Sequence, residues 1–154
     1  MSKVTRKMSG FTLVEVLIVV VIMAILAAAV LPQFADSTLD AKNSSARFNL
    51  FTLRNQIELY KSQHDGALPG DALTELTSRT NKTGTIGTDA ATFPYGPYMK
   101  EIPANPYNNS KTVVLTTQNP PTAEVAGAGW LWDKTNCLLW VNCADAKRYP
   151  FSAQ

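Results

Sequence analysis

The chain has 154 residues, with 14 basic and 12 acidic side chains and a formal net charge of +2 at pH 7. That length suits one ordinary domain, and the near balance of charge excludes a strongly basic nucleic-acid binder. Apolar residues make up 45% of the chain, which is not the composition of a disordered protein. One histidine and two cysteines are fewer than the four ligands that a structural zinc site usually takes.

Residues 1–10 have the composition of a basic leader. They contain Lys3, Arg6 and Lys7 and no acidic residue. Positive charge ahead of an apolar span keeps the N-terminus in the cytoplasm. We therefore expect everything after the span to lie outside the cytoplasm.

Residues 11–35 are predicted to be a transmembrane helix half. The run Phe11–Leu31 holds 21 residues, of which only Thr12 and Glu15 are polar. As a helix this run spans roughly 31 Å, about the thickness of a bilayer's hydrocarbon core. A carboxylate in such a span costs about 2.5–3.5 kcal/mol on insertion scales and needs a partner, so Glu15 requires an explanation.

Two general interpretations leave Glu15 unexplained. One is a secretory signal peptide cleaved after Ala27–Ala29, although the apolar run is longer than the usual stretch of about 7–15 residues. The other is a simple uncleaved anchor. A local interpretation is that Glu15 only sits at a helix N-terminus, where the helix dipole favours an acid and the side chain reaches the interface.

The order of Gly10, Phe11 and Glu15, followed by the apolar run and Pro32, resembles the class III signal of type IV pilins and type II secretion pseudopilins. The resemblance implies that a prepilin peptidase cleaves between Gly10 and Phe11 and methylates the new N-terminus of Phe11. It also implies that Glu15 and Pro32 act in assembly, and that residues 11–35 later form the filament core. Cleavage would create an α-amine that is cationic at neutral pH, and this amine, in an adjacent subunit, is our expected partner for Glu15.

Residues 36–64 are predicted to form an amphipathic continuation of the same helix, from about Phe11 to His64. Apolar residues recur at steps of four and three, at Ala46, Leu50, Leu53, Ile57 and Tyr60. We expect Pro32 to bend or loosen the helix, and Gly66 to cap its C-terminus. The stripe is predicted to pack on the chain's own sheet, with a coiled-coil seam as the alternative.

Residues 65–110 form a turn-rich variable loop by their glycines and prolines. We predict a short helix over Asp71–Ser78 capped by Asp71. His64, at the end of the long helix, is expected to cap it or to lie in solvent, and not to be a catalytic base. The stretch with Ile102-Pro103 and Asn105-Pro106 resembles a pseudopilin segment, although that family has Asp-Pro at the second dipeptide.

Residues 111–154 carry the strand signals, at 112–116, 129–133 and 138–141. We predict a small antiparallel sheet of three or four strands, with its three tryptophans as packing residues. The fold class is therefore α+β and pilin-like: a long N-terminal helix whose amphipathic half packs on a small antiparallel sheet. Residues 36–154 together form the predicted head.

Cys137 and Cys143 leave a disulfide open. An exported protein lies in an oxidising compartment, where two cysteines suggest a bond, and type IV pilins commonly carry one near the C-terminus. A straight strand between them would put the two Cα atoms about 20 Å apart, whereas a disulfide needs about 4.4–6.8 Å. The strand and the bond therefore exclude each other unless the chain bends near Asn142.

No cofactor or enzymatic activity is expected. The resemblance implies a calcium ion in the C-terminal loop of the major pseudopilin, but this region offers only Asp133 and Asp145, with Asn136 and Asn142. Calcium takes six to eight oxygens, usually with several carboxylates, so we do not expect it here. The chain also has no Gly-rich phosphate loop and no HExxH or GxSxG motif.

The sequence thus predicts a structural subunit of a type II secretion pseudopilus or a related type IV pilus-like filament, most like a major pseudopilin. It would be a single-pass protein of the bacterial inner membrane with a periplasmic head, and would then assemble into a helical homopolymer. The resemblance implies a prepilin peptidase, a membrane platform, minor pseudopilins and a cytoplasmic ATPase as partners, without nucleic acid. The alternatives are a type IV pilin for adhesion, motility or DNA uptake, a minor tip subunit, and a single-span anchored periplasmic enzyme.

Overall fold

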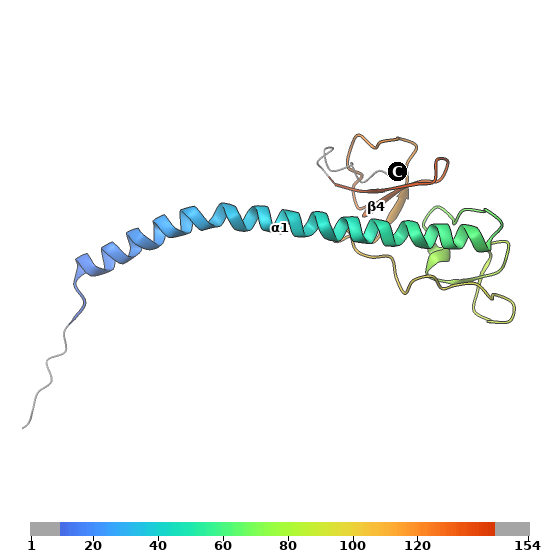
Figure 1. Cartoon of the computed structure of the whole chain (residues 1–154), viewed down its shortest axis with the longest axis horizontal. Helices are drawn as coiled ribbons and strands as arrows, with labels where there is room; N and C mark the ends of the chain where they lie inside the picture. Colours follow the sequence, from blue (N-terminus) through green and yellow to red (C-terminus); the bar gives the residue numbers. More distant parts are fainter. Residues whose placement is uncertain (1–9, 144–154) are drawn as a thin grey trace, which may run out of the picture. The chain divides into compact units, whose positions relative to one another are not determined.

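A computed structural model describes residues 10–143, and the side chains of residues 31–36 are outside the description. One helix, α1 (Leu13–Gln63), dominates the chain and confirms the predicted long N-terminal helix (Figure 1). Its backbone stays helical through Pro32. The chain divides into two compact units at Asp40 and Ala41, so α1 contributes one half to each. The two units are described separately below.

The second half of α1 supplies one wall of the head's hydrophobic core. Its apolar stripe is at most 2% exposed and consists of Ala46, Leu50, Leu53, Ile57 and Tyr60. These are the residues whose four-and-three spacing predicted a buried face. Because they pack against strand residues of the same chain, the interpretation as packing on the chain's own sheet is confirmed.

The other wall is a three-stranded sheet in the order β3 (Val113–Leu115), β4 (Trp130–Asp133) and β5 (Leu138–Val141). The three strands lie where the sequence predicted them. β4 and β5 pair antiparallel through a tight turn, as expected. β3 and β4 pair parallel, which corrects the prediction of a purely antiparallel sheet. The reason is the long connection over residues 116–129, which carries the chain back before β4 begins.

The sheet buries both of its faces, since side chains alternate along each strand. Trp130 and Trp132 of β4 face α1 and belong to the main core. Leu131 and Trp140 point to the opposite side and form a smaller cluster with Ala128. The tryptophans are therefore packing residues, as the sequence suggested, but they serve two separate clusters.

The loop region holds a small hairpin that the sequence analysis missed. β1 (Arg79–Thr80) pairs antiparallel with β2 (Ile86–Gly87). The side chain of Asn81 organises the turn, because its Oδ1 accepts hydrogen bonds from the backbone nitrogens of Thr83 (3.1 Å) and Thr85 (2.9 Å). Strands of two residues have too little length to show a periodicity.

The helix expected over Asp71–Ser78 is wrong. Only one 3₁₀ turn forms, η1 (Thr74–Leu76), and it is preceded by Leu73 with a φ of 54°, a left-handed conformation that no α-helix continues through. Leu73 and Leu76 are nevertheless buried, as expected. The carbonyl of Leu76 accepts hydrogen bonds from the backbone nitrogens of Tyr98 (2.9 Å) and Met99 (3.0 Å). This turn is therefore bonded to a segment distant in sequence and does not continue as a helix.

At the end of α1, Gly66 caps the helix as predicted. Its φ is 86°, and its nitrogen donates to the carbonyl of Lys61 at 2.8 Å. His64 is 2% exposed, which corrects the solvated alternative, while its contact with a carbonyl of the last helical turn fits the alternative of a cap. Its ring stacks on Tyr60 with centroids 3.8 Å apart, and its Nδ1 and Nε2 lie 2.7 Å from the Tyr60 carbonyl and 3.0 Å from Thr80 Oγ1.

Candidate functional site

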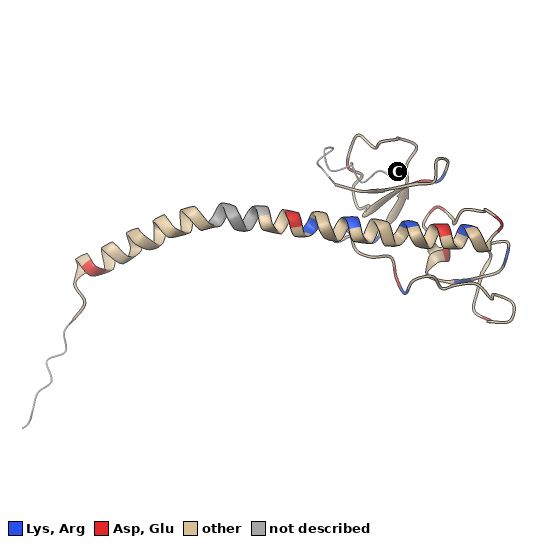
Figure 2. Cartoon of the chain, in the orientation of Figure 1, with Lys and Arg blue, Asp and Glu red and all other residues tan. Residues whose placement is uncertain are grey.

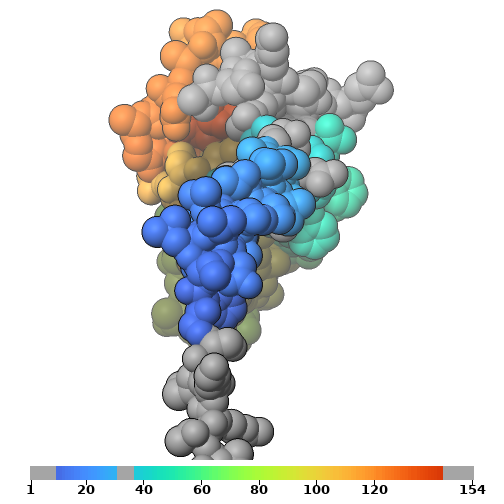
Figure 3. Space-filling view, turned by 90° about the vertical axis from the view of Figure 1, so that its left-hand side faces the viewer, coloured from blue at the N-terminus to red at the C-terminus, as the bar shows by residue number. Residues whose placement is uncertain are grey.

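The first half of α1 presents apolar side chains on all sides. The window Leu13–Val30 has a mean hydropathy of 3.1 and none of it is buried, so by length and composition it can span a membrane. Within this window Glu15 is the only charged side chain, and the second half of α1 carries both signs of charge (Figure 2). Figure 3 shows the side chains of this segment in blue, standing outward from the helix. This surface needs lipid or other apolar surfaces around it.

Glu15 is held at the start of the helix by Thr12. Glu15 Oε2 accepts hydrogen bonds from the Thr12 nitrogen and from Thr12 Oγ1, both at 2.8 Å. The Glu15 nitrogen in turn donates to Thr12 Oγ1 at 3.2 Å. This reciprocal pattern is a capping box, in which a threonine and a glutamate three residues later satisfy the free amides of a helix N-terminus.

The capping box gives the carboxylate of Glu15 a local set of hydrogen-bond donors. It supports the local interpretation of Glu15 as a helix-terminal residue within one subunit. All three hydrogen bonds involve neutral donors, so the negative charge of Glu15 is not neutralised by them. The cationic partner expected from cleavage is a separate requirement, and it stays a prediction.

The proposed cleavage position lies immediately before this box. Gly10 is exposed, and a Cβ added to it would meet no atom within 4 Å. Phe11 is 85% exposed. The fold of the subunit therefore does not require glycine at position 10, and a requirement for it has to come from an enzyme that approaches the backbone.

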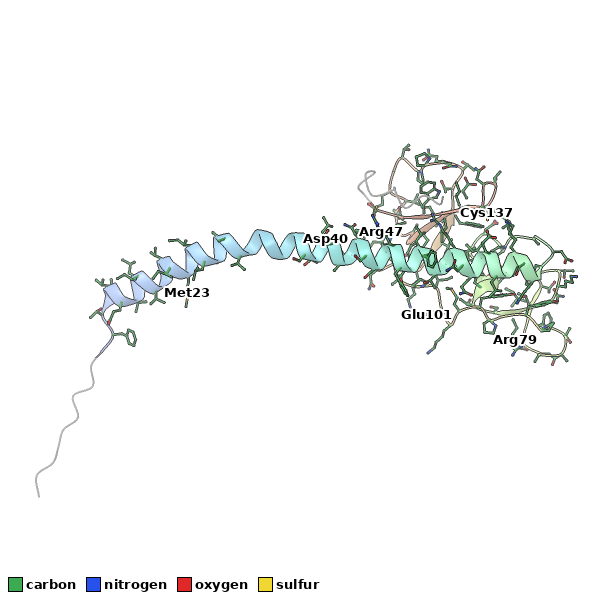
Figure 4. All side chains as sticks on the ribbon, viewed as in Figure 1. Met23, Asp40, Arg47, Arg79, Glu101 and Cys137 are labelled. Atoms are coloured by element: carbon green, nitrogen blue, oxygen red, sulfur yellow. The ribbon has the colours of Figure 1, made fainter. Side chains whose placement is uncertain are left out.

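A second exposed apolar surface lies on the head half of α1, on the side away from the buried stripe. Phe48 and Phe51, one helical turn apart, are 71% and 65% exposed. Beside them is a cleft of about 280 Å³ whose walls include Phe51, Glu58, Trp132 and Cys137. Figure 4 shows Cys137 in the strand region beside α1. This face has the exposed aromatic side chains that are typical of protein contacts.

Comparison with known proteins agrees with this arrangement. Residues 5–31 match the prokaryotic N-terminal methylation motif, which includes Gly10, Phe11 and Glu15. The chain is 32% identical to type II secretion system core protein G of Vibrio cholerae over 109 residues, 70% of each chain. It is 32% identical to that of Aeromonas hydrophila over 104 residues, 68% of this chain and 71% of the relative. The chain belongs to the core protein G family.

The relative in Escherichia coli K12 has the same name and is 29% identical over 113 residues, 73% of this chain and 75% of its own length. No solved structure matches the chain. In this pseudopilin the features that the sequence brought together, from Gly10 to Glu15, are also adjacent in space at the start of α1. The side chain of Pro32 lies outside the description, so its role in assembly stays a prediction.

The two cysteines of this pseudopilin are thiols in the described part of the chain, and β5 runs between them. Burial raises the pKa of the half-buried Cys137 thiol, which disfavours the reactive thiolate. The strand between them covers Leu138–Val141, while Cys137 itself has a φ of 56° and lies in the turn before it. A disulfide between the two after export stays a prediction.

The acidic residues considered for calcium do not meet. Both oxygens of Asp133 accept hydrogen bonds from Asn136, from its nitrogen at 3.1 Å and from Nδ2 at 2.7 Å, in the turn between β4 and β5. Asp145 lies outside the described residues. Among the side chains of residues 10–30 and 37–143, no three histidine, cysteine, aspartate or glutamate residues gather at one place.

Two features of the site were missed by sequence reasoning. Thr12 was treated only as a polar interruption, although Thr-x-x-Glu ahead of an apolar run is a recognised capping signal. Asn105 was treated only as a near match to the aspartate of the pseudopilin segment, and Asn142 only as a weak ligand for calcium or the site of a bend. Both are fully buried and bind backbone groups, and no local pattern announces such contacts.

Proposed function

We propose that this protein is the repeating structural subunit of a type II secretion pseudopilus, without catalytic activity. It is inserted in the inner membrane through the first half of α1, with its N-terminus in the cytoplasm and its head in the periplasm. A prepilin peptidase cleaves it after Gly10 and methylates Phe11. It is then assembled, with other components of the secretion system, into a filament.

The observation that carries this proposal is the pairing of an uncovered apolar half-helix with one acid at its start. The half-helix Leu13–Val30 has no cover within the subunit. After extraction from lipid it has to be covered by the equivalent segments of other copies, since these offer matching apolar surfaces. A bundle of such helices would form the filament core and leave the heads outside.

Glu15 sets the register of that core in our proposal. Within one subunit, Thr12 supplies two hydrogen bonds to one oxygen of the carboxylate, Oε2, while the subunit remains in the membrane. On assembly, the amine of Phe11 from a neighbouring copy supplies the missing positive charge. A subunit that slips along the axis leaves both charges unpaired, which generally costs about 3–5 kcal/mol for a buried pair.

The exposed face of α1 in the head is a further contact surface for neighbouring copies. Phe48 and Phe51 extend the exposed apolar side chains of the helix into the head half. Exposed aromatic pairs of this kind gain free energy when a partner covers them. They therefore support a packing of subunits along the whole of α1.

The test is the variant Glu15→Leu, expressed as the sole copy of the gene. Membrane insertion should be unchanged or better, because the variant removes a charge from the apolar span. Cleavage should persist, since Gly10 is intact. Filament yield in a shearing assay should fall at least about 100-fold, as expected from the loss of one partner of a buried ion pair.

Glu124→Leu is the matched control, since Glu124 is an exposed acid of the head and should assemble normally. Assembly of Glu15→Leu at wild-type yield would show that Glu15 acts only in the capping box. Loss of cleavage in that variant would instead place Glu15 in peptidase recognition and remove the proposed register role.

A further inference from the structure

The segment Val125–Gly129, which leads into β4, is held by a buried asparagine side chain. Asn142 follows β5 directly and is fully buried. Its Nδ2 donates to the carbonyls of Val125 at 2.7 Å and Ala128 at 2.6 Å. Its Oδ1 accepts a hydrogen bond from the backbone nitrogen of Val125 at 3.0 Å. The side chain thus uses both hydrogens of its amide nitrogen and one lone pair of its oxygen on this one segment.

A second buried asparagine continues the same network. Asn105 Nδ2 donates to the carbonyl of Gly129 at 2.7 Å and to that of Asn142 at 2.6 Å. Its Oδ1 accepts a hydrogen bond from the backbone nitrogen of Tyr107 at 2.9 Å. Two buried amides therefore join three stretches of chain: the turn at 105–107, the segment before β4, and the end of β5. We call these two side chains the amide staple.

The pattern of donors and acceptors fixes the orientation of both amides. Each nitrogen faces two carbonyl oxygens and each oxygen faces a backbone N–H. The reversed orientation would place oxygen against oxygen at four contacts. At Asn105 the pseudopilin segment that this stretch resembles has an aspartate, whose carboxylate has no hydrogen to donate to these two carbonyls.

The donor set does not fit the calcium ion that the family resemblance implies for the C-terminal loop. Calcium takes six to eight oxygen ligands. The backbone oxygens of Val125, Ala128 and Gly129 already accept N–H groups, and the partial positive charge of those hydrogens opposes a cation. Of the two described acids in this region, Asp133 uses both oxygens on Asn136, and Glu124, directly before Val125, is exposed.

We propose that the amide staple takes the place of a metal ion in this pseudopilin and makes the stability of its head independent of calcium. Both asparagine side chains are fully buried and all six hydrogen bonds are between 2.6 and 3.0 Å long, so they fix the segment before β4 without a ligand. The device rests on contacts within one chain and holds whether or not the proposed filament forms. A subunit built this way folds equally well at low and high periplasmic calcium.

The experiment measures the thermal midpoint, Tm, of the full-length protein in detergent micelles, with tryptophan fluorescence as the signal. Wild type is titrated with calcium chloride and compared with the same protein in a calcium chelator. The expected Tm is the same throughout, because a ligand raises Tm only when the native state binds it. Asn142→Ala should lower Tm by about 4–8 °C, equally in calcium and in chelator.

Asn142→Asp is the sharper variant, because it keeps the size and the acceptor for Val125 but loses the amide donor. It should be destabilised at least as much as Asn142→Ala. Asn55→Ala, on the exposed face of α1, is the control and should leave Tm unchanged. A saturable rise of the wild-type Tm with calcium overturns the proposal, as does a folded Asn142→Asp with wild-type Tm. If the Asn142 variants do not fold, the wild-type titration alone decides.

Discussion

The two halves of α1 share one backbone conformation but differ in what covers their apolar side chains. In residues 13–30 apolar side chains surround the helix and none is buried within the subunit. In residues 46–60 one stripe of them, from Ala46 to Tyr60, is at most 2% exposed and packs against the chain's own sheet, while Phe48 and Phe51 on the other side stay exposed. A helix buried by its own chain needs one apolar face, whereas a helix surrounded by lipid or other copies needs apolar residues on every side.

This difference separates what the subunit needs in order to fold from what it needs in order to assemble. The head contains its own core, and its contacts are all within residues 41–143. The first half of α1 gives the subunit a surface that is completed elsewhere, first by lipid and then, in our proposal, by other subunits. Changes in the two halves should therefore have separable effects, and four predictions test this separation.

The largest effect is expected at the start of the first half. Gly10→Val should abolish processing, because a side chain at this position blocks close approach of the peptidase to the backbone. Precursor should accumulate in the membrane, and the head should remain folded. Mass spectrometry should show a methylated Phe11 as the first residue of the wild-type protein and an intact leader in the variant. A wild-type chain beginning at Val30 would instead indicate a conventional signal peptide.

Removal of the first half altogether should turn a membrane protein into a soluble one. A fragment of residues 36–154 loses the apolar window but keeps the buried stripe and the sheet. Because Leu50 and Leu53 are covered by the chain's own strands, we expect a monomer in light scattering. A stable dimer that dissociates on Leu50→Lys would show that the stripe is a seam between two helices.

Two side-chain substitutions to alanine, one in each half of α1, compare the halves within the full-length protein. Leu53→Ala leaves a cavity in the head core and should lower the free energy of unfolding by about 2–5 kcal/mol. Val20→Ala shortens an exposed side chain and should leave that free energy unchanged. Urea unfolding in micelles measures both, and the three tryptophans report on the head because they all lie in β4 and β5. Equal losses for the two variants would contradict the separation.

The smallest effect concerns the surface of the head. The hydrogen bond from Lys111 to Glu101, 2.7 Å between Nζ and Oε2, holds the pKa of the Glu101 carboxyl below its ordinary value of 4.5. As the pH falls, the Glu101 carboxylate is therefore protonated in the unfolded chain before it is protonated in the folded one. The stabilisation of the folded state by this ion pair is thus present above pH 4.5 and is lost below it. Lys111→Gln should slightly reduce the loss of stability between pH 5 and pH 3, measured by urea unfolding of the wild type and the variant.

The sequence was enough to predict those features of the molecule that depend on the spacing of neighbouring residues. The apolar window, the stripe from Ala46 to Tyr60 and the positions of β3, β4 and β5 follow from periods that neighbouring residues display. Gly66 as the helix cap follows from the freedom of glycine at positive φ. Such features need no knowledge of distant contacts, because each residue's environment is set by its place on one element.

Other features were decided only in the folded chain. The parallel pairing of β3 with β4, the burial of His64 against Tyr60 and the single turn η1 each depend on segments far apart in sequence. Asn105 and Asn142 show this most directly, since an asparagine reads in sequence as a turn residue and becomes a buried staple only where carbonyl groups from other segments surround it. The sequence by itself determined the membrane segment, the processing signal and the amphipathic helix, because a helix repeats every 3.6 residues. The tertiary structure decided strand direction and polar contacts, because these depend on which distant backbone groups the folded chain brings within hydrogen-bond reach.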